Sequence, residues 1–396
     1  MKIKQFGGIL LITGNAIGGG MLALPLATAQ AGFLNSSFFL IACWGIMLAG
    51  GLLILEVNLW FPPNSHLISM ARATLGIPGE VIAWLCYLLL LYALLAAYIA
   101  GGSDFLQGIL QKIDIQFSAI VTAILFVFIL GPIVYKGIHS VDLMNRILMG
   151  VKLLIFFLLI LYLFPFISSK QLGQGNIQYL PHSLTIIITS FGFAAIIPSL
   201  RSYFQSNVKQ LRRVIILGSL VPLICYILWN AAIMGVIPIH KLSAIAQSNQ
   251  STSHLTNTLS HLLNEKSITL FAWIFTSICL ATSFLGVGIS LSDFLMDGLS
   301  LTRTKINKII VYALTFLPPL MIVVFYPASF MLALNYAGIW CAVLLALLPA
   351  LMAWSGRYSQ QQVDAPYRVM GGKSLLSLLI LSSSIIIAHA IVVDIF

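Results

Sequence analysis

The stretch from Gly14 to Pro25 reads Gly-Asn-Ala-Ile-Gly-Gly-Gly-Met-Leu-Ala-Leu-Pro, and it decides how the rest of the chain is interpreted. It is apolar enough for a membrane interior, yet each glycine costs a helix about 1 kcal/mol relative to alanine. Three consecutive glycines therefore favour a break in the helix. Open backbone inside a bilayer must be buried in protein or line a water-filled cavity. The stretch is thus either a surface for close helix packing or a binding site.

The composition of the 396-residue chain is typical of a protein with many membrane spans. Hydrophobic residues make up 60% of it and charged residues only 8%, whereas ordinary globular proteins have about 25% charged residues. The net charge of +10 is spread over short segments between apolar runs, so it indicates membrane orientation rather than nucleic-acid binding. We expect one membrane domain over residues 1–396, surrounded by lipid. The sequence does not define its oligomeric state.

Apolar runs of about 20 residues are long enough to cross a bilayer as helices. We predict eleven spans, at about 6–33, 36–60, 80–108, 117–135, 143–167, 182–205, 213–238, 268–299, 307–326, 328–354 and 373–394. The polar stretch 240–267 is expected to be a loop that contains one short helix.

The positive residues alternate between the two sides of these spans. With the N-terminus in the cytoplasm, only four lysines fall in outer loops: Lys112, Lys170, Lys241 and Lys266. The cytoplasmic segments hold Lys2, Lys4, Arg72, Lys136, Arg146, Arg201, Lys209, Arg212, Arg213, Arg303, Lys305, Lys308, Arg357, Arg368 and Lys373. Because cytoplasmic loops are enriched in lysine and arginine, we expect a cytoplasmic N-terminus and a periplasmic C-terminus in a bacterial inner membrane.

The sixth span repeats the pattern of the first. Residues 190–199 read Ser-Phe-Gly-Phe-Ala-Ala-Ile-Ile-Pro-Ser, again a glycine followed by a proline. The two interrupted spans lie five spans apart, so the second copy would be inverted in the membrane. Interrupted spans at matching positions of two halves point to a transporter binding site. We therefore expect inverted repeats at about 6–167 and 182–354, with spans 1 and 6 discontinuous and the helix at about 373–394 added.

The two breaks together offer both poles that a zwitterionic amino acid needs. Backbone N–H groups freed at Ile17, Gly18, Gly19 and Gly20 would attract a carboxylate. Carbonyl groups freed in either break would attract an ammonium group or a cation. We assign the amine to carbonyls near Phe191, Gly192, Phe193 and Ala194. The alternative is that the small residues only allow close helix packing.

One lysine within a span is a candidate for ion coupling. Lys152 lies six residues beyond Arg146, about 9 Å further along a helix. It either snorkels back to the interface or faces the bundle, where burial disfavours its charged form and would let it load and release a proton. Thr282 and Ser283 in span 8 could supply hydroxyl oxygens to a cation, although such hydroxyls usually bond to their own backbone.

Four of the acidic residues near span ends have simpler explanations. Glu56 is expected to pair or to cap a helix rather than transfer protons. Asp104 should lie hydrated at the outer end of span 3. Asp293 and Asp297 are expected to face Arg303 or Lys305.

Signals of enzymatic or metal chemistry are missing from the sequence. The seven histidines are scattered without metal-ligand spacing, and there is no phosphate-binding glycine loop. The five cysteines lie in apolar runs and are expected to be buried hydrophobes. Lys2, Lys4 and the following apolar run imitate a signal peptide, but Asn15, the glycines and Pro25 interrupt that run. We expect no catalytic residue, no cofactor, no metal and no cleavage there.

Several of these motifs resemble the hydroxy/aromatic amino acid permease family, especially the bacterial tyrosine- and tryptophan-specific permeases. They are Gly18–Pro25, Glu56 at the end of span 2, Ser190–Phe193 with Pro198-Ser199, and Ala281–Gly286. The resemblance runs over all eleven spans. It implies a LeuT-type inverted-repeat fold and proton-coupled uptake, with Lys152 in the place of a sodium ion between spans 1 and 8. The family commonly has His-Gly where this chain has Ala194-Ala195.

The sequence therefore predicts a secondary transporter that imports an aromatic amino acid with a proton, tyrosine before tryptophan. The substrate side chain would lie among spans 3, 6, 8 and 10, with Tyr98, Phe193 and Phe284 as candidates. The alternatives are sodium coupling or a serine or threonine substrate. A membrane-embedded enzyme or a channel is disfavoured, because clustered catalytic residues and rings of charge are missing.

Overall fold

The computed structural model describes residues 2–63, 65–204, 207–248, 250–263, 265–302, 304–360 and 366–395, and these contain helices but no strand. Within these described residues, ten helical segments are long and apolar enough to cross a membrane. Helices α1 (Lys2–Ala16) and α2 (Gly19–Ala27) together qualify as an eleventh span, bent by 53°. This agrees with the eleven spans predicted from hydropathy.

Spans 2 to 5 are formed by α3 (Phe33–Leu59), α4 (Leu67–Lys112), α5 (Ala119–Lys136) and α6 (Ile138–Leu163) with the 3-10 turn η1 (Phe164–Phe166). Helix α4 begins earlier than predicted, because residues 67–75 form a helix before a kink. The kink falls at Gly76, whose φ of 73° is a left-handed conformation that glycine tolerates, and Pro78 follows it.

Span 6 is built from three pieces. Helix α8 (Leu184–Ser190) ends, the 3-10 helix η4 (Gly192–Ile196) follows, and α9 (Ile197–Tyr203) completes the span. It is preceded by α7 (Ser169–Leu172), η2 (Ile177–Tyr179) and η3 (Pro181–Ser183). The sixth span is therefore interrupted, as the first is.

The remaining spans are α10 (Val208–Val236), α13 (Lys266–Gly298), α14 (Lys305–Phe325), a composite tenth span and α17 (Gly372–Ile395). The tenth span joins α15 (Ser329–Ala342), η5 (Val343–Leu347), α16 (Leu348–Trp354) and η6 (Ser355–Ser359), in which η5 and η6 are π-helical. The loop before α13 holds two helices rather than the one predicted, α11 (Ile239–Ala246) and α12 (Ser251–Leu263).

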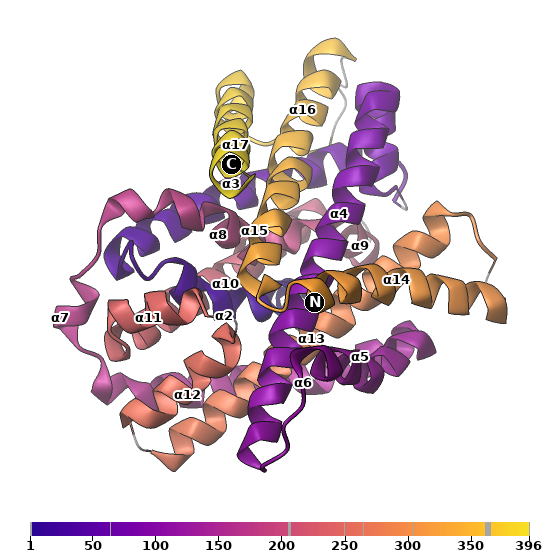
Figure 1. Ribbon diagram of the computed structural model, residues 1–396. Helices are drawn as coiled ribbons and strands as arrows, with labels where there is room; N and C mark the ends of the chain where they lie inside the picture. Colours follow the sequence, from indigo (N-terminus) through magenta and orange to yellow (C-terminus); the bar gives the residue numbers. More distant parts are fainter. Residues whose placement is uncertain are drawn as a thin grey trace.

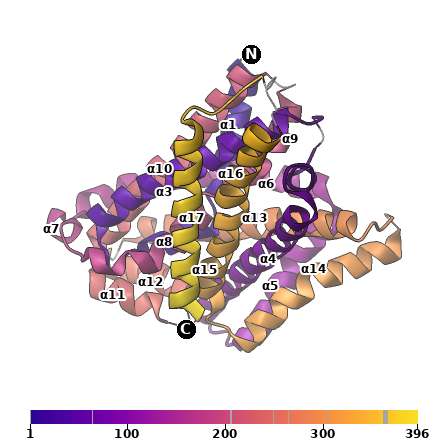
Figure 2. The same ribbon diagram turned by 90° about the horizontal axis from the view of Figure 1, so that it is seen from above.

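The helices pack into one bundle, and most residues of α2 and α8 are buried within it. Helix α1 lies against α10, α2 lies against α8 and α10, and α13 lies against α6 and α4. Helix α17 runs along the outside of the bundle beside α15 and α16 (Figure 2). The ends of the described chain lie at opposite edges of the molecule (Figure 2), and α7, α11 and α12 gather at one edge (Figure 1). We call this edge the α12 side.

Candidate functional site

The break in span 1 lies at Ile17 and Gly18, in the interior of the bundle. Helix α1 ends at Ala16 and α2 begins at Gly19, and Ile17 is 1% exposed. Gly18 precedes α2 with φ −155° and ψ −149°, an extended conformation. The break therefore leaves carbonyl groups at the end of α1 and N–H groups at the start of α2 without partners in their own helices.

The three glycines of the break each meet a different helix. A Cβ atom added at Gly18 would lie 2.1 Å from Ser283 Oγ of α13, and one at Gly19 would lie 2.7 Å from a ring carbon of Tyr98 of α4. One at Gly20 would lie 3.2 Å from Ser190 Oγ of α8. The glycines thus serve close packing as well as the break, and the binding site at this break stays a prediction.

Lys152 joins this break to two other spans. Its side chain is buried, and Nζ donates a hydrogen bond to the carbonyl oxygen of Ile17 at 2.5 Å. Nζ also lies 3.4 Å from Thr282 Oγ1, which donates its own hydrogen to the Ile278 carbonyl. The alternative in which Lys152 snorkels to the interface is therefore wrong, because its ammonium group is enclosed between α1 and α13.

Ser283 takes a different position from its neighbour Thr282. Its Oγ accepts a hydrogen bond from the Gly19 N–H at 2.9 Å. One of the amides expected to bind a carboxylate is thus bonded to protein in this conformation. The Gly18 carbonyl accepts from the Met21 N–H at 3.1 Å. The Gly19 N–H and the Gly18 carbonyl therefore both have partners within the protein.

Tyr226 of α10 is a polar residue at the breaks that the sequence did not single out. Its hydroxyl lies 2.7 Å from the carbonyl oxygen of Ala16 and 2.7 Å from that of Ser190. These residues are the last of α1 and of α8, so one hydroxyl contacts both interrupted spans. The residues lie 210 and 36 positions from Tyr226 in the chain, and no local sequence pattern signals such contacts.

The predicted residues of span 6 are buried around this point. Phe191 packs its ring on Tyr226, with the ring centroids 5.2 Å apart. Phe193 and Ala194 are fully buried, and both face α3 near Gly51. Gly192 lies near Cys341, because a Cβ added there would be 3.7 Å from that sulfur. Residues 191–194 thus lie at the interruption but contact different neighbours.

The three aromatic candidates for a side-chain pocket are not brought together. Tyr98 lies over Gly19 at the first break. Phe284 packs instead between Phe126 of α5 and Phe316 of α14, at centroid distances of 5.2 and 5.3 Å. Adjacent helical residues point in different directions, so Ser283 faces the break while Phe284 faces these rings.

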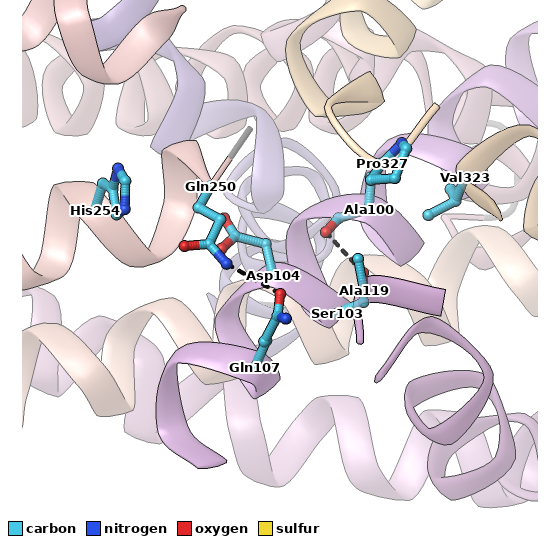
Figure 3. A pocket seen from close by; sticks show the side chains of 9 residues that line it. All are labelled: Ala100, Ser103, Asp104, Gln107, Ala119, Gln250, His254, Val323 and Pro327. Atoms are coloured by element: carbon cyan, nitrogen blue, oxygen red, sulfur yellow. Dashed lines mark hydrogen bonds between the residues drawn. The ribbon is translucent and has the colours of Figure 1, made fainter. Parts of the chain in front are cut away.

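A pocket of about 400 Å³ lies on the α12 side rather than at the breaks. Figure 3 shows Asp104, Gln107 and Gln250 gathered in one part of it, with Val323 and Pro327 in another. The Gln250 amide donates to Gln107 Oε1 at 3.0 Å. These polar groups already have protein partners, so the pocket is a weaker candidate for substrate binding than the breaks.

The prediction that Asp104 is hydrated is wrong, because its side chain is buried and caps α12. Its Oδ2 accepts from the N–H groups of Thr252 at 2.8 Å and Ser253 at 3.2 Å, and also from the Thr252 hydroxyl. Its Oδ1 accepts from the Ser253 hydroxyl at 2.5 Å. A carboxylate at a helix N-terminus stabilises that helix, so α4 holds α12 in place.

The prediction that Glu56 pairs is confirmed. Its carboxylate receives two hydrogen bonds from Arg357, at 2.7 and 2.5 Å, and one from the Val369 N–H at 2.6 Å. Both charged side chains are 1% exposed.

All five cysteines are buried, as predicted. Arg303 lies outside the described residues, so its pairing with Asp293 or Asp297 stays a prediction. The described residues contain no cluster of three or more histidine, cysteine or acidic side chains that could hold a metal.

A bundle of ten or eleven candidate spans in the described residues, two of them interrupted, is typical of a multi-pass helical membrane protein. A family model described as the tryptophan/tyrosine permease family matches residues 1–390. The chain is 34% identical to the tyrosine-specific transport system 2 of Haemophilus influenzae, over 98% of this chain and 96% of that protein. It is 30% identical to the tryptophan-specific transport protein of Shigella flexneri (94% and 91%) and 32% identical to glutamine transporter 2 of Aliivibrio fischeri (96% and 97%).

The chain belongs to the tryptophan/tyrosine permease family. It is therefore an amino acid permease and not an enzyme. This confirms the resemblance found in its motifs.

Proposed function

We propose that this protein is a secondary active transporter that imports an aromatic amino acid together with a proton, with tyrosine favoured over tryptophan. It would act in a bacterial inner membrane with a cytoplasmic N-terminus and a periplasmic C-terminus. Relatives named for tyrosine and tryptophan transport support the substrate class. The lysine and arginine distribution supports the orientation.

We propose a LeuT-type arrangement for the mechanism. The halves at about 6–167 and 182–354 would rock against each other, with residues 373–394 outside them. The first turn of α2 would hold the substrate carboxylate, and the carbonyls of the two breaks would hold the amine. The closed packing around Gly18 to Gly20 fits a conformation in which access requires movement of α1 or α2.

The observation that carries the proton coupling is the contact of Lys152 with Ile17. A protonated lysine supplies a charge-assisted hydrogen bond to the end of α1, and such bonds are stronger than neutral ones. Loss of the proton would weaken this bond and the attraction to the negative end of the α1 dipole. Proton release could thereby permit α1 to move, which links protonation to alternating access.

Uptake into liposomes tests this function. We expect a pH gradient to drive accumulation of labelled tyrosine, and unlabelled tryptophan to compete better than serine, threonine or glutamine. Accumulation driven only by a sodium gradient would favour the sodium-coupled alternative. Competition by serine, threonine or glutamine without competition by aromatic amino acids would overturn the substrate assignment.

Lys152→Ala tests the coupling residue. We expect it to abolish substrate-driven proton uptake while some substrate binding remains, because the ammonium group is removed but the glycine break is kept. Lys112→Ala is a matched control, since that lysine lies over the Trp273 ring at the end of α4, away from the break. Proton flux that is unchanged in Lys152→Ala would contradict the role.

A further inference from the structure

Where Tyr226 contacts the two breaks, a single hydroxyl hydrogen faces two carbonyl oxygens. A tyrosine hydroxyl has one hydrogen to donate, yet it lies 2.7 Å from both the Ala16 and the Ser190 carbonyl oxygens. It can satisfy one of them with a linear bond at a time. The three oxygens therefore share one hydrogen in a place where the hydroxyl is fully buried. We call these three oxygens the Tyr226 cluster.

The electrostatics of the cluster favour a cation with several hydrogens. Ala16 ends α1 and Ser190 ends α8, and each helix end carries partial negative charge on its free carbonyls. A buried polar atom without a hydrogen-bond partner is destabilising. A primary ammonium group has three N–H donors, so it can satisfy the second carbonyl and a lone pair of the hydroxyl.

Lys152 does not supply the missing donor, because its ammonium group bonds to a different carbonyl group. Its Nζ donates to Ile17, and the next carbonyl, that of Gly18, is bonded to the Met21 N–H. The break in span 1 thus has separate partners for its successive carbonyl groups. Ala16 is the one that shares its donor with a second helix.

The cluster also lies next to the start of α2. A Cβ added at Gly20 would be 3.6 Å from the Ser190 Cα and 3.2 Å from its Oγ. An amino acid carries its ammonium and carboxylate groups on one carbon, so its two binding sites must be adjacent. The N-terminus of α2 and the Tyr226 cluster meet this condition.

We propose that Tyr226 is a substrate-binding residue whose hydroxyl, together with the Ala16 and Ser190 carbonyls, receives the ammonium group of the transported amino acid. The ring is held against Phe191, which fixes the hydroxyl between the two helices. Binding of the amine would then tie α1 and α8 to each other through one charged group. This inference rests on the proposed transport function and adds a side chain to it.

The experiment combines Tyr226→Phe with tyrosine and with two analogues that each lack one of its charged groups. Inhibition of labelled tyrosine uptake is measured for tyrosine, for tyramine, which lacks the carboxylate, and for 3-(4-hydroxyphenyl)propionate, which lacks the amine. Loss of a hydrogen bond to a charged group corresponds to about 10-fold or more in affinity. We expect Tyr226→Phe to weaken tyrosine and tyramine by this factor and to change the amine-free ligand less than about 2-fold.

Tyr92→Phe is the matched control, since the Tyr92 hydroxyl donates to the Leu314 carbonyl at 2.8 Å between α4 and α14. It should leave all three ligands unchanged. Thermal unfolding of both variants reports whether the fold is kept, and membrane vesicles replace purified protein if Tyr226→Phe unfolds in detergent.

Equal weakening of amine-bearing and amine-free ligands, or no weakening of tyrosine, would overturn the role of Tyr226. Failure of the wild-type protein to take up any aromatic amino acid would instead overturn the proposed substrate. In that case the same comparison is made with the amino acid that it does transport and the analogue of that amino acid without its amine.

Discussion

Two carboxylates that are buried in the described part of the chain, Glu56 and Asp104, are satisfied by different means. Glu56 of α3 has a charged partner, Arg357, and the pair joins segments 301 residues apart. Asp104 of α4 receives hydrogen bonds from the hydroxyl and N–H groups of Thr252 and Ser253. No ion pair with Asp104 occurs within the described ranges of the chain.

The difference predicts how firmly each contact is held. Removing one member of a buried ion pair leaves an uncompensated charge inside the protein. Removing Asp104 leaves only neutral donors, and Asp104 itself lines a pocket of about 400 Å³, which is large enough to hold water. We therefore expect a substitution of Asp104 to lower the free energy of unfolding less than a substitution of Glu56.

The largest effect is expected from Glu56→Gln, because it removes the charge opposite a buried guanidinium. We expect a loss of about 3–5 kcal/mol in the free energy of unfolding, measured by thermal or denaturant unfolding in detergent. Glu80→Gln is the control: Glu80 pairs with Arg72, whose side chain is 65% exposed, and such pairs contribute about 0–1 kcal/mol. Equal losses in the two variants would contradict the comparison.

Asp104→Asn should have an intermediate effect. The amide keeps one acceptor oxygen but faces N–H and hydroxyl donors with its own NH₂ group, so we expect a loss of about 1.5–3 kcal/mol. Hydrogen exchange should rise in residues 250–263, since the N-terminus of α12 loses its carboxylate. A loss larger than that of Glu56→Gln would reverse the proposed order.

The smallest effect is expected from Thr252→Val, which removes a hydroxyl but keeps the N–H bond to Asp104. We expect about 0.5–1.5 kcal/mol, again with faster exchange at the start of α12. Thr256→Val is its control, because the Thr256 hydroxyl bonds to the Thr252 carbonyl of its own helix. Faster exchange in the control alone would show that Asp104 does not hold α12.

The predictions that succeeded depend on residues close together in the chain, and those that failed depend on contacts between distant residues. The predicted spans match helices such as α3, α10 and α13 within a few residues, because hydropathy depends on neighbouring residues only. The kink at Gly76 and the second loop helix were missed, since weakly apolar segments carry little periodic signal. The pairing of Glu56 was predicted as a type of interaction, but its partner could not be identified.

The sequence by itself determined that the chain crosses a membrane many times and that its first and sixth spans are interrupted. Both properties follow from the transfer of side chains to lipid and from the conformational cost of glycine, which act over short stretches. Only the tertiary structure decided which donors meet the freed carbonyls, namely Lys152 at Ile17 and Tyr226 at Ala16 and Ser190. It also decided that Asp104 is buried. These contacts join residues as far as 210 positions apart, and they exist only where packing brings separate helices within hydrogen-bonding distance.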